Sequence, residues 1–569
     1  MTDLIRDTAF GALIRALTRG RLLQFEEDRQ PATYRLRYAE QSSTGTHGPA
    51  TKNDPLFEKL PLEDGQVAAK HEPTSRSSSD GGETEKSKDV NLVDWYGPSD
   101  PANPLNWSSA KKTFVVFQIC LLTTSIYLGS SIYTPAIPSV SESFGVSIVS
   151  STLGLTLFVV GYGLGPMLFS PMSEVPFIGR GPVYLGTLAV FVALQGATVK
   201  ASSFGMLMAF RFLTGFFGSP VLATGGATCA DLYRPAKRAY AMSIWGLAAV
   251  CGPALGPVIG GYVTEFGTIN GTFTAAWQWP LYTLMWIGAV CLLFLFFAMP
   301  ETSASNILFR RAQRLRRITG NAKLMSTPEI QAQQMTGREI LNMCLIHPFT
   351  LSFTEPMLFF LNLYLALIYG LLYLWFESFP IVFIEIHGFT LGQSGLAFIG
   401  ILAGALVVIP PFFWYMHKKL EPAFDENGDL QPEKRLPPCF VGAFCIPICL
   451  FWFGWSARAD VHWILPIIGS AWFAIGSFLL FMAILNYLPD AYPQHIAAVL
   501  AGNDLARSWF GAAFPLFARA MFNKLGVAWA NSMLAFISIA FIPIPFVLFK
   551  YGPVLRNKYS KIAKKDPGY

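Results

Sequence analysis

Residues 252–261 read Gly252-Pro253-Ala-Leu-Gly256-Pro257-Val-Ile-Gly260-Gly261 and lie inside an apolar stretch near 239–263. Glycines spaced by four residues leave one face of a helix without side chains, so a neighbouring helix can approach backbone to backbone. The two prolines remove helical hydrogen bonds and permit a bend, which membrane helices tolerate where neighbours satisfy the freed carbonyls. The stretch therefore predicts a closely packed helix within a membrane-spanning bundle.

The composition of the whole chain agrees with a membrane protein. Of the 569 residues, 52% are hydrophobic and only 14% are charged, whereas soluble domains carry about 25% charged residues. The net charge of +6 reflects basic loops and predicts no nucleic-acid partner. An ordinary soluble enzyme is excluded by this composition.

Sequence signatures of catalysis are missing. The seven histidines form no H-E-x-x-H pattern, and the chain has neither a G-x-x-x-x-G-K-[ST] nor a G-x-S-x-G sequence. Most of the eight cysteines lie in apolar runs without a C-x-x-C pair, which favours buried thiols over disulfides or zinc ligands. We therefore expect no enzyme activity, no metal site and no cofactor.

Hydropathy predicts the number of bilayer crossings. A spanning helix needs about 20 mostly apolar residues, and twelve stretches qualify. They lie near 113–135, 148–170, 182–200, 204–230, 239–263, 278–299, 356–385, 395–416, 438–457, 463–488, 497–520 and 527–550. The sequence thus predicts an all-α integral membrane protein, although a channel or an embedded enzyme could also have twelve spans.

Basic residues set the predicted orientation. The segment between the sixth and seventh spans carries seven of them: Arg310, Arg311, Arg314, Arg316, Arg317, Lys323 and Arg338. Because cytoplasmic loops are enriched in Lys and Arg, this segment and both termini should be cytoplasmic. We expect a six-helix half at 111–300, a cytoplasmic linker at 301–355, a second half at 356–550 and a basic tail at 551–569. Two halves around one pathway are typical of secondary transporters.

Residues 1–110 form a separate, polar region that should be largely disordered, most of all from Gln41 to Lys88. One exception is the spacing of Phe10, Leu13, Ile14 and Leu17, which predicts a short amphipathic helix. This helix could lie on the membrane surface, or it could fray without a role.

Arg211 is the most informative single residue. It lies about seven residues inside the fourth span, roughly 10 Å deep. A charged group at this depth is costly, so it should face a partner or a wet cavity unless its side chain reaches the interface. We expect an acidic partner close to Arg211.

Three further ionisable residues lie within predicted spans. Glu377 is near the outer end of the seventh span, where it could either meet the interface or bind substrate. Asp504 and Arg507 are three residues apart on the eleventh span, close enough to pair, either as a structural ion pair or as a coupling site.

The Gly-Pro stretch resembles the antiporter motif of major facilitator drug:proton exporters. The loop Ser170-Pro-Met-Ser-Glu174-Val-Pro-Phe-Ile-Gly179-Arg180 is similar to the acidic, Gly-Arg loop of that superfamily, but Val175 replaces the usual Arg and one residue is inserted before Gly179. The resemblance implies that residues 252–261 seal against a partner helix. It also implies that Arg211, in an R-F-x-x-G setting, and Asp231 take part in proton coupling.

The resemblance extends over nearly all of residues 93–550. Val93-Asp-Trp-Tyr-Gly97, Asn362-Leu-Tyr-Leu-Ala-Leu-Ile-Tyr-Gly370 and Asn486-Tyr-Leu-Pro-Asp-Ala-Tyr492 are similar to the fungal twelve-span drug:proton antiporters of the benomyl/methotrexate- and fluconazole-resistance type. This family implies the major facilitator fold and a plasma-membrane exporter that exchanges lipophilic drugs for protons, working as a monomer. Export of one metabolite, such as a polyamine or a secondary metabolite, is the alternative in transport, and a transporter-like sensor is the alternative in another class.

The topology also predicts one glycosylation site. Asn270-Gly-Thr272 is a sequon in the loop that the predicted orientation places outside the cell. Asn106-Trp-Ser108 is a sequon on the cytoplasmic side and should stay unmodified.

Overall fold

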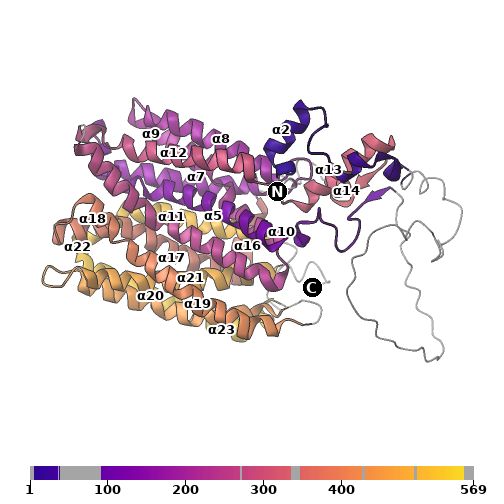
Figure 1. The fold of residues 1–569 in the computed structure, drawn as a ribbon. Helices are drawn as coiled ribbons and strands as arrows, with labels where there is room; N and C mark the ends of the chain where they lie inside the picture. The colour runs from indigo at the N-terminus through magenta and orange to yellow at the C-terminus, as the bar shows by residue number, and fades with distance from the viewer. Residues whose placement is uncertain are drawn as a thin grey trace.

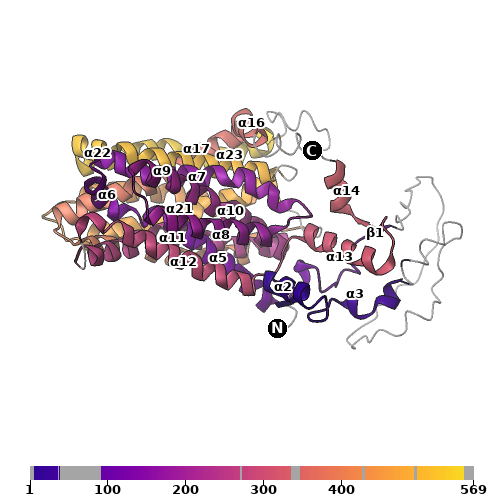
Figure 2. The same cartoon turned by 90° about the horizontal axis from the view of Figure 1, so that it is seen from above.

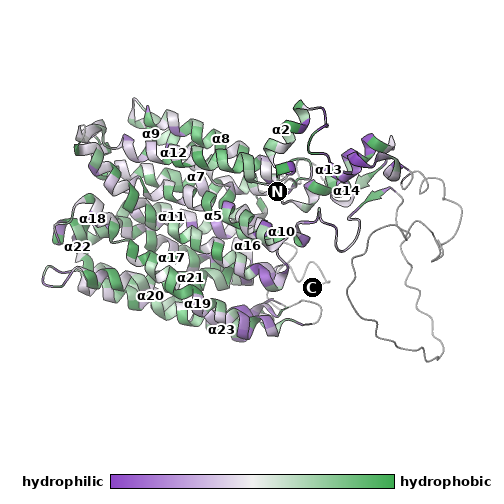
Figure 3. Ribbon diagram, viewed as in Figure 1, coloured by the Kyte–Doolittle hydropathy of each residue, from purple (hydrophilic) through white to green (hydrophobic). Residues whose placement is uncertain are grey.

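The computed structural model describes residues 5–35, 38, 91–269, 272–334, 346–425, 430–492 and 496–556. These residues form a bundle of long, nearly parallel helices, and a smaller assembly projects from one end of it (Figures 1 and 2). We call the end that carries helix α13 (Ala304–Thr319) the linker end, and the other the opposite end. Figure 3 shows apolar residues along the bundle and hydrophilic residues concentrated at the linker end.

The first half of the bundle is formed by the helices from α5 to α12. Its members are α5 (Ser109–Ser131), α6 (Ile137–Phe144), α7 (Ile148–Glu174), α8 (Arg180–Val199), α9 (Phe204–Gly218), α10 (Pro220–Leu232), α11 (Pro235–Ile269) and α12 (Gln278–Ala298). The second half contains α16 (His347–Thr354), α17 (Pro356–Phe379), α18 (Leu391–Leu396), α19 (Ile399–Tyr415), α20 (Pro437–Ser456), α21 (Ile464–Ala491), α22 (Ile496–Phe541) and α23 (Pro543–Val554).

Eleven continuous stretches of the described residues are long and apolar enough to cross a membrane. The last one, Ala498–Val554, is far too long for one crossing and is interrupted at Gly526, whose backbone is not helical (φ 75°, ψ 159°). Arg519 contacts Glu385 at the opposite end, and Gly552 lies beside Glu433 at the linker end, so the chain reverses between them. This course is consistent with the twelve crossings that the hydropathy predicts.

Of the N-terminal region 1–110, the structure describes residues 5–35, 38 and 91–110, which include short helices. Helix α2 (Ala9–Leu17) confirms the predicted amphipathic helix, and its Phe10 ring packs against Phe296 and Phe297 of α12. Leu13 and Leu17 stay 48% and 75% exposed. Residues 41–90, where the disorder prediction is concentrated, lie outside the described residues.

The assembly at the linker end is built around Arg311 of α13. Its guanidinium donates to Asp100 at 2.7 Å, lies 3.3 Å from the Glu27 carboxylate of α3 (Glu26–Arg29) and stacks over the Tyr96 ring. Strand β1 (Leu92–Val93) pairs in parallel with β2 (Met325–Ser326), which precedes α14 (Thr327–Gln334). Burial alone would raise the pKa of Asp100, but hydrogen bonds from Arg311 and two backbone N–H groups outweigh it and lower that pKa. N-terminal segments are thereby tied to the linker.

Candidate functional site

A small cavity lies in the middle of the bundle, between the two halves. Its volume is about 50 Å³ and its walls are almost entirely apolar and aromatic. Tyr127 of α5 and Trp245 of α11 contribute from the first half. From the second half come Tyr369 of α17, Phe481 and Met482 of α21, and Arg507 of α22.

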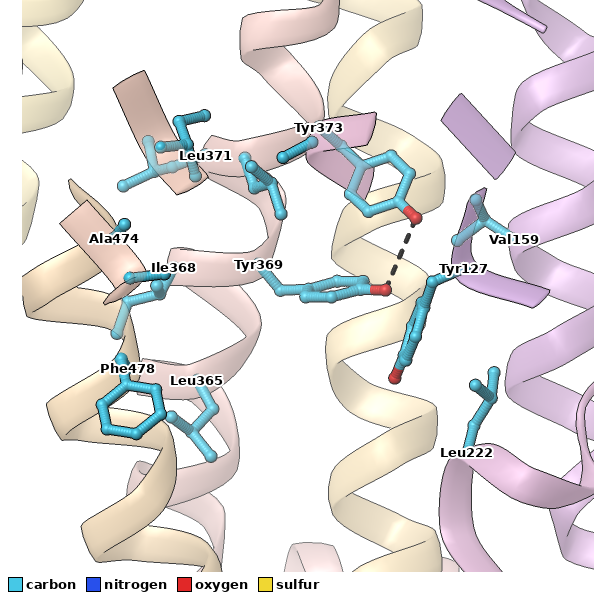
Figure 4. Close-up of a cluster of buried hydrophobic side chains, with 14 of the residues drawn as sticks. Tyr127, Val159, Leu222, Leu365, Ile368, Tyr369, Leu371, Tyr373, Ala474 and Phe478 are labelled. Carbon is cyan, nitrogen blue, oxygen red and sulfur yellow. Dashed lines mark hydrogen bonds between the residues drawn. The ribbon is translucent and has the colours of Figure 1, made fainter. Parts of the chain in front are cut away.

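Tyrosines join the two halves beside this cavity. The Tyr162 hydroxyl of α7 lies 2.6 Å from that of Tyr369 and 2.8 Å from that of Tyr373, and Tyr373 also hydrogen-bonds Ser130 of α5 at 2.8 Å. Figure 4 shows Tyr369 and Tyr373 projecting from α17 toward Tyr127 on the other half. The sequence analysis missed this cluster, because no motif marks tyrosines that meet across more than 200 residues.

Asp504 and Arg507 form the predicted ion pair and also contact the other half. The Arg507 Nε donates to Asp504 Oδ1 at 2.8 Å, and a terminal nitrogen donates to the Tyr127 hydroxyl at 3.0 Å. Both side chains are buried, and Asp504 Oδ2 has no hydrogen-bond partner among the described residues. Arg507 borders the central cavity and, with Asp504, a smaller space of about 20 Å³ on its linker side.

Arg211 is fully buried, but the prediction of an acidic partner is wrong for the residues that the structure describes. Its guanidinium donates to the backbone carbonyls of Gly154 in α7 at 2.9 Å and of Gly129 in α5 at 3.1 Å. The charge also lies over the rings of Tyr133 and Phe158, 4.8 and 4.4 Å from their centroids. Carbonyl dipoles and aromatic faces therefore take the place of a carboxylate, and Arg211 ties α9 to two neighbouring helices.

Asp231 contacts the predicted loop motif and not Arg211. At the linker end, Arg180 Nε donates to Asp231 at 2.5 Å, whereas Glu174, the expected acid of that motif, is exposed. Gly179 has φ 82°, and a Cβ there would lie 2.7 Å from Asn306, so glycine is required. Sequence reasoning missed Glu301, whose carboxylate accepts the N–H groups of Arg180 and Gly181 at the start of α8.

The Gly-Pro stretch of α11 packs as its spacing predicts. A Cβ at Gly252 would lie 2.5 Å from the Cβ of Tyr127, and one at Gly256 would lie 2.7 Å from the backbone nitrogen of Ile132 in the first half. On the other face, a Cβ at Gly261 would meet the backbone of Leu391 at the start of α18, in the second half. The remaining small or rigid positions of the stretch, Pro253, Pro257 and Gly260, are buried in the same helix. Whether this packing prevents leak stays a prediction.

The structure describes one of two other expected sites, and that one lies away from the cavity. Glu377 is buried on α17 near the opposite end and lines neither space that borders Asp504 or Arg507. Asn270 lies outside the described residues. In the part of the chain that the structure describes, no group of three His, Cys, Asp or Glu side chains is arranged to hold a metal ion.

Ion pairs that the sequence did not reveal join the halves at the linker end. Asp490 of α21 binds Arg238 of α11 at 3.0 Å and also pairs with Arg435 of the second half. Lys237 lies 2.7 Å from Glu421. These pairs connect the start of α11 to the second half.

Comparisons with known proteins agree with this architecture. The family model described as Major Facilitator Superfamily matches residues 119–515. Transporter mfs1 of Schizosaccharomyces pombe is 45% identical, and the alignment covers 84% of this chain and 91% of that protein. Fluconazole resistance protein 1 of Saccharomyces cerevisiae is 40% identical over 86% of this chain and 88% of its own length. The solved proton:xylose symporter XylE has a similar fold, with a TM-score of 0.55 at 15% identity, covering 78% of this chain and 96% of that one.

Proposed function

Because the chain belongs to the major facilitator superfamily, we propose that it is a proton-coupled antiporter that exports lipophilic small molecules. The observation that carries the proposal is the aromatic cavity between the halves, bordered by a buried ion pair that reaches across to Tyr127. An exporter needs a substrate site and a titratable group that respond to the same movement of the halves. Here Arg507 belongs to both, because it lines the cavity and also binds the titratable Asp504.

The cavity walls favour lipophilic substrates. Aromatic and methionine side chains bury large areas and repack readily around different shapes. Drug-sized ligands need pockets of about 300–1,000 Å³, so a cavity of about 50 Å³ corresponds to a closed state of the transporter. The name of the yeast fluconazole resistance protein supports azoles as the first substrates to test.

Asp504 is the group we assign to proton binding. When ionised it neutralises Arg507, and when protonated it frees the guanidinium to strengthen its contact with Tyr127 or with a substrate acceptor. Its second oxygen has no partner among the described residues and can take the proton without breaking another bond. Arg211 contributes to coupling by holding α5, α7 and α9 in one arrangement. Asp231 contributes through its ion pair with Arg180.

The linker end is cytoplasmic in this proposal and the membrane is the plasma membrane. The concentration of arginine in α13 supports that orientation. Substrate would therefore leave through the opposite end, while protons move inward along their gradient. One chain contains the complete cavity, which supports a functional monomer.

Transport by purified protein in liposomes tests the proposal. An imposed pH gradient should drive labelled fluconazole or a lipophilic cationic dye against its concentration gradient, and collapse of the pH gradient by an ionophore should stop it. A transporter-like sensor would bind these compounds without flux. An exporter of one metabolite would leave both probes unmoved, and either result would contradict the proposal.

A further inference from the structure

A second apolar hollow opens on the outside of the second half, near the linker end. Helix α16 lies there against α17 and α22 (Figure 2). The hollow has a volume of about 260 Å³, and Phe353 and Trp509 at its rim are 72% and 54% exposed. Because apolar side chains on this surface face lipid, the hollow opens toward the bilayer and not toward water.

Its depth corresponds to one leaflet of the membrane. Asn362 lies six residues after the start of α17, and Asn503 lies seven residues after the start of α22. At 1.5 Å per residue both positions are about 9–11 Å from the linker end. If that end is cytoplasmic, the hollow is level with the inner leaflet, where lipophilic compounds collect.

Two asparagines separate the hollow from the interior of the transporter. Asn503 Nδ2 donates to Asn362 Oδ1 at 2.9 Å, and Asn362 Nδ2 donates to Ser352 on α16 at 3.2 Å. Asn362 and Ser352 line the hollow, whereas Asn503 lines the internal space beside Asp504 and Arg507. The hydrogen-bonded amide pair therefore lies between the hollow and the internal space beside the proposed coupling site.

The inner asparagine is incompletely satisfied. Asn503 is 1% exposed, and its Oδ1 has no hydrogen-bond partner among the described residues. A buried, unpaired amide oxygen costs about 1–3 kcal/mol, which a purely structural contact would tend to avoid. Such an atom next to a cavity is suited to a ligand with a hydrogen-bond donor.

We propose that this hollow is a lateral access site, through which a lipophilic substrate passes from the inner leaflet to the central cavity, with Asn362 and Asn503 as its gate. The proposal rests on the proposed export function and adds the route by which substrate arrives. The substrate's apolar body would occupy the hollow while its polar group exchanges hydrogen bonds with the two amides. A lipid acyl chain would fit the apolar walls but has no polar group along its length to replace the amide pair.

Filling the hollow tests the proposal. Ala506 lines it and is only partly buried, so Ala506→Trp places an indole inside. The matched control is Ala193→Trp on the exposed face of α8, far from both cavities. With rhodamine 6G, a lipophilic fluorescent cation, as the probe, we expect Ala506→Trp to slow initial gradient-driven efflux at least fivefold, and Ala193→Trp to match the unmodified protein.

A labelling experiment tests the access route without relying on the bulky Ala506→Trp variant. A lipophilic probe that carries a photoactivatable diazirine should label the segment around Ser352 in membranes, and rhodamine 6G should reduce that labelling. Normal efflux by well-folded Ala506→Trp, or labelling that the dye does not reduce, would assign the hollow to lipid and overturn the access route. If the unmodified protein itself fails to move the dye, the export function has failed and not merely the route.

Discussion

Replacing Asp504 with asparagine separates coupling from substrate binding. The amide keeps the size of the carboxylate but cannot titrate. Arg507 would then be a buried cation without a carboxylate partner among the described residues. Breaking a buried pair in this way costs about 3–5 kcal/mol, of which a hydrogen bond to the new amide can return about 1 kcal/mol. We therefore expect a destabilised but folded protein.

The effect on transport should be larger than the effect on stability. A pH gradient of one unit carries about 1.4 kcal/mol per proton, which supports about tenfold accumulation of substrate in one-for-one exchange. Proteoliposomes containing the unmodified protein should approach that ratio, whereas Asp504→Asn should stay near unity. Exchange of labelled for unlabelled substrate without a gradient should persist in the variant, because the apolar walls of the cavity are unchanged.

Two controls make the result interpretable. Glu377→Gln removes a buried carboxylate on α17 that lines neither space beside the ion pair, and it should keep coupling. The double variant Asp504→Asn/Arg507→Gln removes both charges and should recover thermal stability without recovering accumulation. Tenfold accumulation by a well-folded Asp504→Asn protein would refute the assignment of the proton to this residue.

Other substitutions test the packing and the linker. Gly260→Ala should lower membrane abundance several-fold, because its Cβ would press on the backbone of Ile132, whereas Gly186→Ala, which has open space around the new methyl group, should be neutral in the same immunoblot. Arg211→Ala should lower the melting temperature of the purified protein, with a loss of about 2–4 kcal/mol from the emptied space; a melting temperature equal to that of the unmodified protein would instead favour a role in coupling alone. The lowered pKa of Asp100 means that its contribution to the linker assembly is complete above about pH 4 and is lost only as the pH falls through that lowered value. Tryptic cleavage at Arg311 should therefore be constant from pH 8 to 6 in the unmodified protein and faster throughout in Asp100→Asn. An unchanged cleavage rate in the variant would count against a stabilising role of the Arg311–Asp100 contact.

Hydropathy predicted the spans well, because a segment that crosses the bilayer must be apolar and must form its backbone hydrogen bonds within its own helix. The stretch predicted near 148–170 is α7 (Ile148–Glu174), and the one predicted near 278–299 is α12 (Gln278–Ala298). The Asp504–Arg507 pair was also predictable, since three residues in a helix bring two side chains together. Each of these features depends on local sequence alone.

Contacts between distant segments could not be predicted in this way. Arg211 finds its partners 57 and 82 residues away, and those partners are backbone carbonyls, which every residue has. The asparagines of the lateral hollow are 141 residues apart. Prediction of an acidic partner for Arg211 failed for this reason: burial of a charge requires compensation, but does not specify which group provides it.

The chemistry of the contacts between the halves differs along the bundle, and this difference favours opening at the linker end. There the halves meet through ion pairs such as Lys237–Glu421 and Arg238–Asp490, whose side chains keep some exposure to solvent. An exposed pair such as Lys237–Glu421 contributes about 0–1 kcal/mol, because water replaces the lost partner, and opening at this end would also hydrate the less exposed Arg238–Asp490 pair. At the opposite end α11 and α18 touch through glycine and backbone, with Gly261 against Leu391 and Gly395 against Pro257, and separation there exposes closely packed surface with no comparable replacement. The closed state should therefore open more readily toward the linker end. Higher salt, which weakens the ion pairs there, should favour that opening, whereas a disulfide across the same end should block transport.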